Sequence, residues 1–366
     1  MIPMNKIIQN EYYPDVVSAP GETLLEILEE REMTQVGLAE RTGRPIKTIS
    51  EIINAKTAIT TETALQFEKV LGVPAGFWIN RERNYREWKA REAERVELEK
   101  CLPWMKYFPI RNMIRMGWIK KFDDDITQLI ELLSFFSIAS PEQWKPIWET
   151  ANVNYRRSPA YAADRYIASA WLRKGELEAQ QIQCAPYDAT RFRTALSKIR
   201  SLTTSGPEEF VPAMTKLCAE AGVAVVFVHE LPRLQTSGAT RWLTPTKAMI
   251  QLSLLYKRDD QLWFTFFHEA GHILLHGKRD IFLEGTGIGD DKEDDANQFA
   301  ADTLIPPAEY RRFNPRKEHF SAAEVNDFAE QIGIAPGIVV GRLQHDKYLP
   351  ITHLNGLKHP LTWVDD

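Results

Sequence analysis

Polar and apolar residues recur with two different periods along this chain. In the segments 126–136 and 163–183, apolar residues return every three or four positions, which predicts amphipathic helices. Residues 222–231, GVAVVFVHEL, form instead a β-branched run that is typical of a strand. Residues 239–244 and 248–256 follow as further strands, separated by turn residues. Strands that precede a pair of helices predict a small α+β domain.

Residues 21–100 predict a compact helical domain. Thr34 is placed to N-cap a first helix, and Gly43 supplies the turn that follows it. Pro45 then opens a second helix, whose inward-facing positions are isoleucines. Two short helices joined through a glycine turn make a helix-turn-helix. The charged stretch 81–100 that ends this segment is typical of a solvated helix or a helical linker.

The second helix of this pair presents the residues that would approach the base edges of DNA. Arg41, Arg44, Lys47 and Lys56, set against Glu51, give this region a local positive face, although acids slightly outnumber bases over residues 20–100. We therefore expect modest, salt-sensitive binding to a DNA operator, which a homodimer would strengthen. The alternative is a helical bundle that makes protein contacts only. The candidate DNA contacts are Gln35, Arg44, Lys47, Thr48, Glu51 and Lys56.

The segment 262–277, LWFTFFHEAGHILLHG, predicts a helix that can bind a metal ion. On a helix, residues i and i+4 lie one above the other, so His268 and His272 can present two imidazoles to one ion. Glu269 lies beside them and can act as the catalytic base, which is the logic of the HExxH zinc site. The flanking residues are apolar, which indicates a buried helix in which these polar groups need partners. Core histidines that are satisfied without a metal are the alternative.

A catalytic zinc ion needs a third protein ligand and an open position for water. We exclude His276, because it lies about 12 Å of helix rise beyond His268. At about 100° per residue, Glu293 falls within the apolar stripe of the next helix, whereas Asp295 falls on its polar side. We therefore predict Glu293 as the third ligand, with Asp295 as the alternative. Asn297, one turn after Glu293, is expected to hydrogen-bond a ligand.

The sequence HEAGHILLH at 268–276, followed by ExDANxFAADxLIP at 293–306, resembles the ImmA/IrrE family of metallo-endopeptidases. The resemblance implies a bacterial, gluzincin-like protease that cleaves repressors or other regulatory proteins. Asp295 stands where many members of the family carry Glu. The expected cofactor is Zn²⁺, because two imidazoles and a carboxylate suit zinc, and Mn²⁺ is the alternative ion.

The N-terminal domain resembles the HigA-type antitoxin branch of XRE-like helix-turn-helix proteins. The likeness rests on PGETL at 20–24, ERTGRP at 40–45, ISEIINAK at 49–56 and AITTETALQFEKVLGVPAGFW at 58–78. Ile46 stands where members often carry a polar or basic residue. Three further segments recur in fusions of a HigA-like domain with an ImmA/IrrE domain: WMKYFPIRNMIRMGWI, YRRSPAYAADRYIASAWLRKGE and GIVVGRLQHD.

Together these features predict a multidomain fold, in which an all-α helix-turn-helix domain is joined to an α+β zincin-like metallopeptidase domain with a small, mainly antiparallel sheet and the HExxH helix. The strand 248–256 directly precedes that helix and is expected to be an edge that receives substrate as an added strand. The segment 334–344 could pass as a second helix-turn-helix, but we favour a helix pair that closes the protease domain. The predicted regions are an N-terminal arm (1–20), the helix-turn-helix domain with its helical linker (21–100), a helical middle region (101–205), the peptidase core (206–310) and a C-terminal helical region (311–366).

Composition and charge limit where the protein is expected and how it can contact DNA. The sequence has no run of about 18 apolar residues, so no membrane segment is expected. Its start lacks the layout of a signal peptide, and its three cysteines are widely spaced, which favours a cytoplasmic location. The net charge of −5 gives no global attraction to nucleic acid, so DNA contacts must come from a local patch.

We therefore expect a cytoplasmic bacterial regulator that combines DNA binding with zinc-dependent cleavage of a regulatory protein, namely a repressor, a toxin or an antitoxin partner. The alternative is a non-proteolytic antitoxin and transcriptional repressor, which acts by binding a toxin and DNA and keeps its metal for stability. A metallo-hydrolase that acts on a small molecule ranks third, because a helix-turn-helix fusion suits a protein target.

Overall fold

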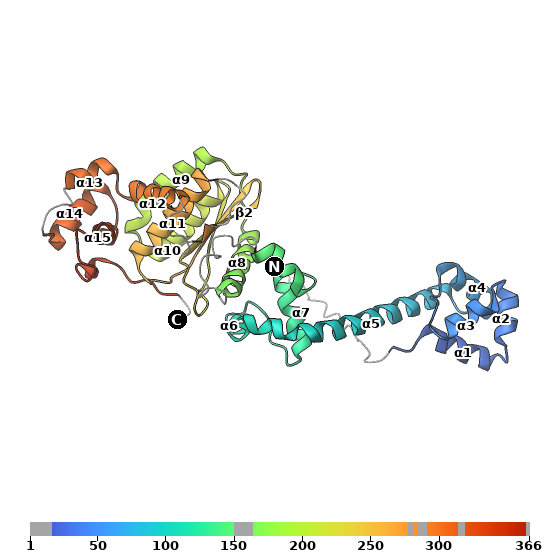
Figure 1. Ribbon diagram of the computed structural model, residues 1–366. Coiled ribbons are helices and arrows are strands. Elements are labelled where there is room, and N and C mark those ends of the chain that lie inside the picture. Colours follow the sequence, from blue (N-terminus) through green and yellow to red (C-terminus); the bar gives the residue numbers. More distant parts are fainter. Residues whose placement is uncertain (1–16, 150–163, 277–281, 284–290, 314–318, 364–366) are drawn as a thin grey trace, which may run out of the picture. The chain divides into compact units, whose positions relative to one another are not determined.

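The structure is a computed structural model that describes residues 17–149, 164–276, 282–283, 291–313 and 319–363 (Figure 1). Contacts divide the chain into two units, Met1–Lys100 and Cys101–Asp366. The predicted N-terminal arm lies almost entirely outside the described residues. Within the described residues, no helix combines the length and the apolar character needed to cross a membrane.

The first unit is helical. Its helices are α1 (Pro20–Glu30), α2 (Gln35–Thr42), α3 (Ile46–Ile53), α4 (Thr61–Leu71) and α5 (Ala75–Cys101), the last of which ends at the unit boundary. Thr34 N-caps α2 through its side chain, and Gly43 ends α2 with a φ of 70°, a left-handed conformation that favours glycine. Leu38 of α2 and Ile49 of α3 are buried in one core. The predicted helix-turn-helix is therefore confirmed.

The helix α5 begins in this core and continues through the charged stretch 81–100. Trp78 near its start is fully buried, whereas most residues beyond it are exposed. Ion pairs between successive turns lie along it, such as Arg91 with Glu87 at 2.8 Å. The predicted solvated helix is thus present.

The second unit is built on a four-stranded sheet with the order β1-β3-β2-β4. The strands are β1 (Val223–Phe227), β2 (Gly238–Thr244), β3 (Lys247–Leu252) and β4 (Phe282–Leu283). β1 and β3 are parallel, whereas β2 is antiparallel to both β3 and β4. The sheet is therefore mixed, with antiparallel pairs in the majority as predicted.

The prediction that the strand at 248–256 is a free edge is wrong. β3 pairs with β1 on one side and with β2 on the other, so its backbone groups are already hydrogen-bonded and cannot receive a substrate strand. The strand also ends at Leu252, four residues earlier than predicted. Its last five residues are all buried, which is typical of a central strand.

Helices cover both faces of this sheet (Figure 1). On one face, Val225 and Ile250 share a core with α9 (Ala189–Ser201), α10 (Pro207–Ala219) and α11 (Asp259–Leu275). On the other face, Val226 and Met249 pack with α6 (Ile110–Arg115), α7 (Asp125–Phe136) and α8 (Asp164–Gln181). Short helical turns lie at Leu102–Tyr107, Pro141–Gln143, Lys145–Glu149, Leu202–Thr204 and Asn355–Leu357. The helical middle region (101–205) thus contributes to both covers of the sheet, with α6, α7 and α8 on one face and α9 on the other, and it lies in the same unit as the peptidase core.

The helices α12 (Asp291–Leu304), α13 (Pro307–Phe313), α14 (Ala322–Ile332) and α15 (Pro336–His345) follow the sheet. α14 packs against α15, and α15 packs against α11. Ile338, Val339 and Leu343 of α15 are buried in the core that it shares with α11. A recognition helix needs one exposed face, whereas every residue of α15 before His345 is buried or partly buried. This burial favours a structural helix pair, which stays a prediction.

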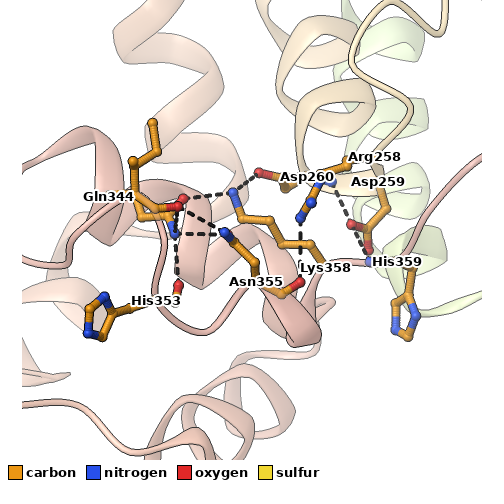
Figure 2. A network of polar contacts seen from close by, with 9 residues as sticks. Arg258, Asp259, Asp260, Gln344, His353, Asn355, Lys358 and His359 are labelled. Carbon is orange, nitrogen blue, oxygen red and sulfur yellow. Dashed lines mark hydrogen bonds and ion pairs between the residues drawn. The ribbon is translucent and has the colours of Figure 1, made fainter.

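The C-terminal segment closes over the first turn of α11 (Figure 2). Lys358 Nζ lies 2.6 Å from Asp260 Oδ2, and the two side chains are only 7% and 2% exposed. Asp259 Oδ1 accepts a hydrogen bond from the amide of His359 at 2.9 Å. Lys358 also donates to Gln344 Oε1 of α15 at 2.8 Å. The segment thus ties the start of α11 to the end of α15.

Candidate metal centre

The helix α11 carries the HEAGH motif into the core of the second unit. Its first turn holds two aspartates, whose charge suits the positive end of a helix. Trp263 and Phe266 pack the helix into the core beneath the sheet and are almost fully buried. The polar residues of the motif are consequently buried as well, with exposed fractions of 1% for His268, 0% for Glu269 and 1% for His272.

A contact between small residues brings α12 close to α11. A Cβ atom placed on Gly271 would lie 3.2 Å from Ala296 Cα and 3.2 Å from the ring of Phe299. The missing side chain therefore allows the two backbones to approach each other. Glu293, almost one turn before Ala296, is buried on the side of α12 that faces α11. Ala296, Ala300 and Leu304 of the predicted apolar stripe are buried and Phe299 is partly buried, which agrees with the predicted helical phase.

Three possible ligand atoms converge between the two helices. His268 Nε2 and His272 Nε2 are 3.0 Å apart, and the carboxylate oxygens of Glu293 lie 3.3 Å from the first and 3.5 Å from the second. Zinc binds nitrogen and oxygen at about 2.0–2.2 Å in tetrahedral geometry, which requires ligand atoms about 3.3–3.6 Å apart. The observed separations are close to this spacing. The three residues therefore fit a tetrahedral metal ion such as zinc.

Burial keeps His272 in the neutral form that a metal ligand requires. Burial first, and then the charges of His268, His276 and Lys292, lower the pKa of His272 to about 2. At neutral pH the ring therefore carries its proton on one nitrogen and offers the lone pair of the other.

Glu269 lies where β2 begins. A Cβ atom on Gly238, the first residue of β2, would lie 2.7 Å from Glu269 Oε1 and 2.5 Å from Thr265 Cγ2. Glycine at this position therefore leaves the space that the Glu269 side chain occupies. Thr240 Oγ1 donates a hydrogen bond to the carbonyl oxygen of Glu269 at 3.1 Å. Sequence reasoning missed both β2 residues, because neither belongs to a recognisable motif.

Asn297 and Asp295 have different surroundings on α12. Asn297 Oδ1 lies 3.0 Å from Nδ1 of His268, which is the contact expected of it. The side chain of Asp295 is 68% exposed and lies 3.8 Å from Nε2 of His276. Within the described residues, the group of converging ligand atoms comprises His268, His272 and Glu293. The geometry thus favours Glu293 over Asp295 as the third ligand.

A pocket of about 480 Å³ lies beside this centre, between α11, α12 and α15. Asn297 lines it together with the apolar side chains of Phe264, Leu304 and Ile338. Because Asn297 also contacts His268, the pocket extends to the immediate surroundings of the centre. Its volume is that of an ordinary ligand pocket.

The predicted DNA contacts lie on or near α3. Gln35 and Thr48 are partly buried, whereas Lys47 and Lys56 are exposed. Lys47 Nζ lies 3.8 Å from Glu51, and its side chain is 84% exposed. An exposed ion pair of this kind is weak, so Lys47 can exchange it for a phosphate group.

Arg44 is placed differently from the other candidates. Its guanidinium group donates to Gln66 Oε1 at 2.6 Å and pairs with Glu62 at 3.0 Å, both on α4. The side chain is only 20% exposed. Arg44 therefore holds the turn of the helix-turn-helix against α4, whereas Arg41, Lys47 and Lys56 are exposed.

Comparisons with known proteins agree with both halves of this description. Residues 24–78 match the model of a helix-turn-helix family, and residues 223–343 match that of the IrrE N-terminal-like domain, a peptidase family. Both matches agree with the recognitions made from the sequence, namely a helix-turn-helix in the N-terminal part and an IrrE-like domain of a peptidase family in the C-terminal part. No curated protein matches the chain significantly.

Two solved structures resemble a part of the chain. A putative antidote protein of a plasmid maintenance system from Nostoc punctiforme is 30% identical, and the match covers 23% of this chain and 92% of that one with a TM-score of 0.23. An addiction module antidote protein of the HigA family from Coxiella burnetii is 29% identical over 23% and 92% of the two chains, with a TM-score of 0.21. At these scores the likenesses do not bear on what this chain binds.

Proposed function

We propose that this protein is a DNA-binding regulator whose second unit is a zinc-dependent endopeptidase that cleaves a regulatory protein, such as a repressor, a toxin or an antitoxin partner. The observation that carries the proposal is the convergence of His268, His272 and Glu293 at separations that suit one tetrahedral ion. A glutamate directly follows the first histidine, in a domain of a peptidase family.

The roles of the residues follow from their positions. His268, His272 and Glu293 would hold Zn²⁺, which when bound supplies a Lewis acid that polarises the scissile carbonyl and acidifies water. Glu269 is the base that takes a proton from the attacking water and returns it to the leaving nitrogen. Because Gly238 leaves room for the Glu269 side chain, the start of β2 determines the position of this carboxylate.

The presence of both domains in one chain indicates the class of substrate. A protease in the same chain as a DNA-reading helix would act where transcription is regulated, and a protein bound at or near the operator is the natural target. The pocket beside Asn297 has apolar walls and would accept a side chain of that protein. Contact with the operator would be made by Lys47 and Thr48 of α3 and by Lys56 in the loop that follows this helix.

The metal content of the purified protein tests the site. We expect about one zinc per chain by mass spectrometry in protein prepared without added metal, and the same in Asp295→Ala. The Glu293→Ala variant should lose it, because two imidazoles alone leave the ion without its third ligand. Wild-type protein without zinc, even after zinc is supplied, would refute the proposed centre.

Cleavage of a library of proteome-derived peptides tests the chemistry. The Glu269→Gln variant keeps the shape of the side chain and all three ligands, so it should retain zinc while cleavage falls by about 100-fold or more. If the wild type cleaves nothing and the variant still represses transcription or neutralises a toxin, the binding-only antitoxin is the correct function.

A further inference from the structure

His276 has no place in the group of ligands, yet it is buried beside one of them. Its side chain is 5% exposed, and its Nδ1 lies 2.9 Å from Nδ1 of His272. The helix α11 ends at Leu275, and His276 has an extended backbone whose N–H donates to the carbonyl oxygen of His272. The end of the helix therefore places His276 against His272 through both its backbone and its ring.

If His272 binds a metal through Nε2, the protons on the His272 and His276 rings can be arranged in only one way. A ligating Nε2 carries no proton, so the proton of the neutral ring is on Nδ1. Nδ1 of His272 must then donate, and the nitrogen that faces it, Nδ1 of His276, must accept. A neutral His276 consequently carries its own proton on Nε2, the nitrogen that lies 3.8 Å from the carboxylate of Asp295.

We propose that His276 is a positioning residue, which orients His272 for the metal by accepting the hydrogen bond from its Nδ1. The inference rests on the proposed metal site and adds to it the residue that sets the tautomer of one ligand. Metal-binding histidines generally donate their second ring N–H to an acceptor that fixes the ring and raises its basicity. In this chain the acceptor for His272 is an imidazole, whereas the acceptor for His268 is the amide oxygen of Asn297.

Asp295 has a secondary part in this arrangement. Its carboxylate favours the proton of His276 on Nε2 and so leaves Nδ1 of His276 as the acceptor. The distance of 3.8 Å and the exposure of 68% make this a weak, screened contact. Asp295, the alternative ligand in the sequence analysis, is therefore better placed to contact His276 than to bind the metal.

Zinc affinity in three histidine variants tests the inference. His276→Leu fills the space but cannot accept, so the zinc dissociation constant should rise about 10- to 100-fold. His276→Asn places an amide oxygen near the position of Nδ1, so it should stay within about threefold of the wild type. His345→Leu, at a histidine whose side chain is 83% exposed, is the matched control and should change nothing.

Competition with a chromophoric chelator gives the zinc dissociation constants. The melting temperatures of the metal-free proteins show whether a change in zinc affinity arises from a change in stability. We expect the metal-free His276→Leu variant to melt within a few degrees of the wild type, with a smaller rise on adding zinc. A purely structural role would instead lower the metal-free melting temperature and leave the dissociation constant unchanged, and that result would overturn the inference. So would failure of His276→Asn to restore the affinity.

The tautomers themselves can be observed by nuclear magnetic resonance. In zinc-loaded protein with ¹⁵N-labelled histidine, long-range proton–nitrogen spectra should show His276 neutral and protonated on Nε2. A proton on Nδ1 of His276, or on both nitrogens, would overturn the inference. Wild-type protein that binds no zinc would refute this inference and the proposed centre together, whereas loss of cleavage without change in these spectra would refute only the proposed catalysis.

Discussion

The buried ion pair between Lys358 and Asp260 gives a prediction whose size follows from the structure. Lys358→Met keeps the length and apolar stem of the side chain and removes its charge. The carboxylate of Asp260 would then stay 2% exposed without its cation. Removing one partner of a buried pair generally costs about 3–5 kcal/mol, because the remaining charge is left uncompensated. The position of Asp260 in the first turn of α11 offsets part of this loss, by about 1 kcal/mol.

We therefore expect the second unit to lose about 3 kcal/mol of its free energy of unfolding, or roughly 6 °C in melting temperature for a unit of this size. Tryptophan fluorescence during denaturation with urea reports on this unit, since of the ten tryptophans only Trp78 and Trp88 lie in the first one. The double variant Lys358→Met with Asp260→Asn removes both charges and should recover most of the loss.

An exposed ion pair serves as the control for this experiment. Arg312 pairs with Glu309 at 2.8 Å, but its side chain is 73% exposed, so Arg312→Met should change the stability by less than about 1 kcal/mol. The reasoning would be refuted if Lys358→Met cost no more than this control, or if the double variant were as unstable as the single one. Zinc content should be unchanged throughout, because α11 stays folded.

Three further predictions concern the two sites. Gly238→Ala should displace the Glu269 side chain and reduce peptide cleavage at least about tenfold with zinc retained; full activity would show that β2 does not position the base. Gly271→Val should push α12 away from α11 and weaken zinc binding by about tenfold or more in chelator competition, and an unchanged affinity would contradict the role of this close contact. Lys47→Glu should weaken DNA binding and reduce the slope of log affinity against log salt by about one, whereas an unchanged slope would remove Lys47 from the interface.

Local signals made the helix-turn-helix and the HEAGH helix predictable. A cap at Thr34 and a left-handed turn at Gly43 act within a few residues, so the sequence alone contains the cause of the structure. The same holds for His268 and His272, whose proximity follows from one helical turn. The choice of Glu293 over Asp295 followed from helical phase, because an acid within an apolar stripe must face whatever the helix packs on.

Contacts between distant segments were not predictable in the same way. The order of the strands depends on how the chain crosses between them, and a strand next to the motif helix in sequence proved to be central in the sheet. Its composition did carry a signal, since 248–252 has almost no polar alternation, as expected of a strand covered on both faces. Gly238, by contrast, is one of 19 glycines, and nothing local marks its contact with Glu269.

The variable positions of the HEAGH motif show why its chemistry and its packing cannot be separated. Ala270 and Gly271 lie between the two histidines, and both are fully buried. Ala270 belongs to the core shared with the sheet, whereas Gly271 touches α12. Because the proposed third ligand lies on α12, the distance that Gly271 permits decides whether the carboxylate of Glu293 reaches the two imidazoles. A helix with the same histidines but a larger residue at 271 would then keep two of the proposed ligands and lose the third, so the small residue is as necessary to the proposed metal centre as the histidines themselves.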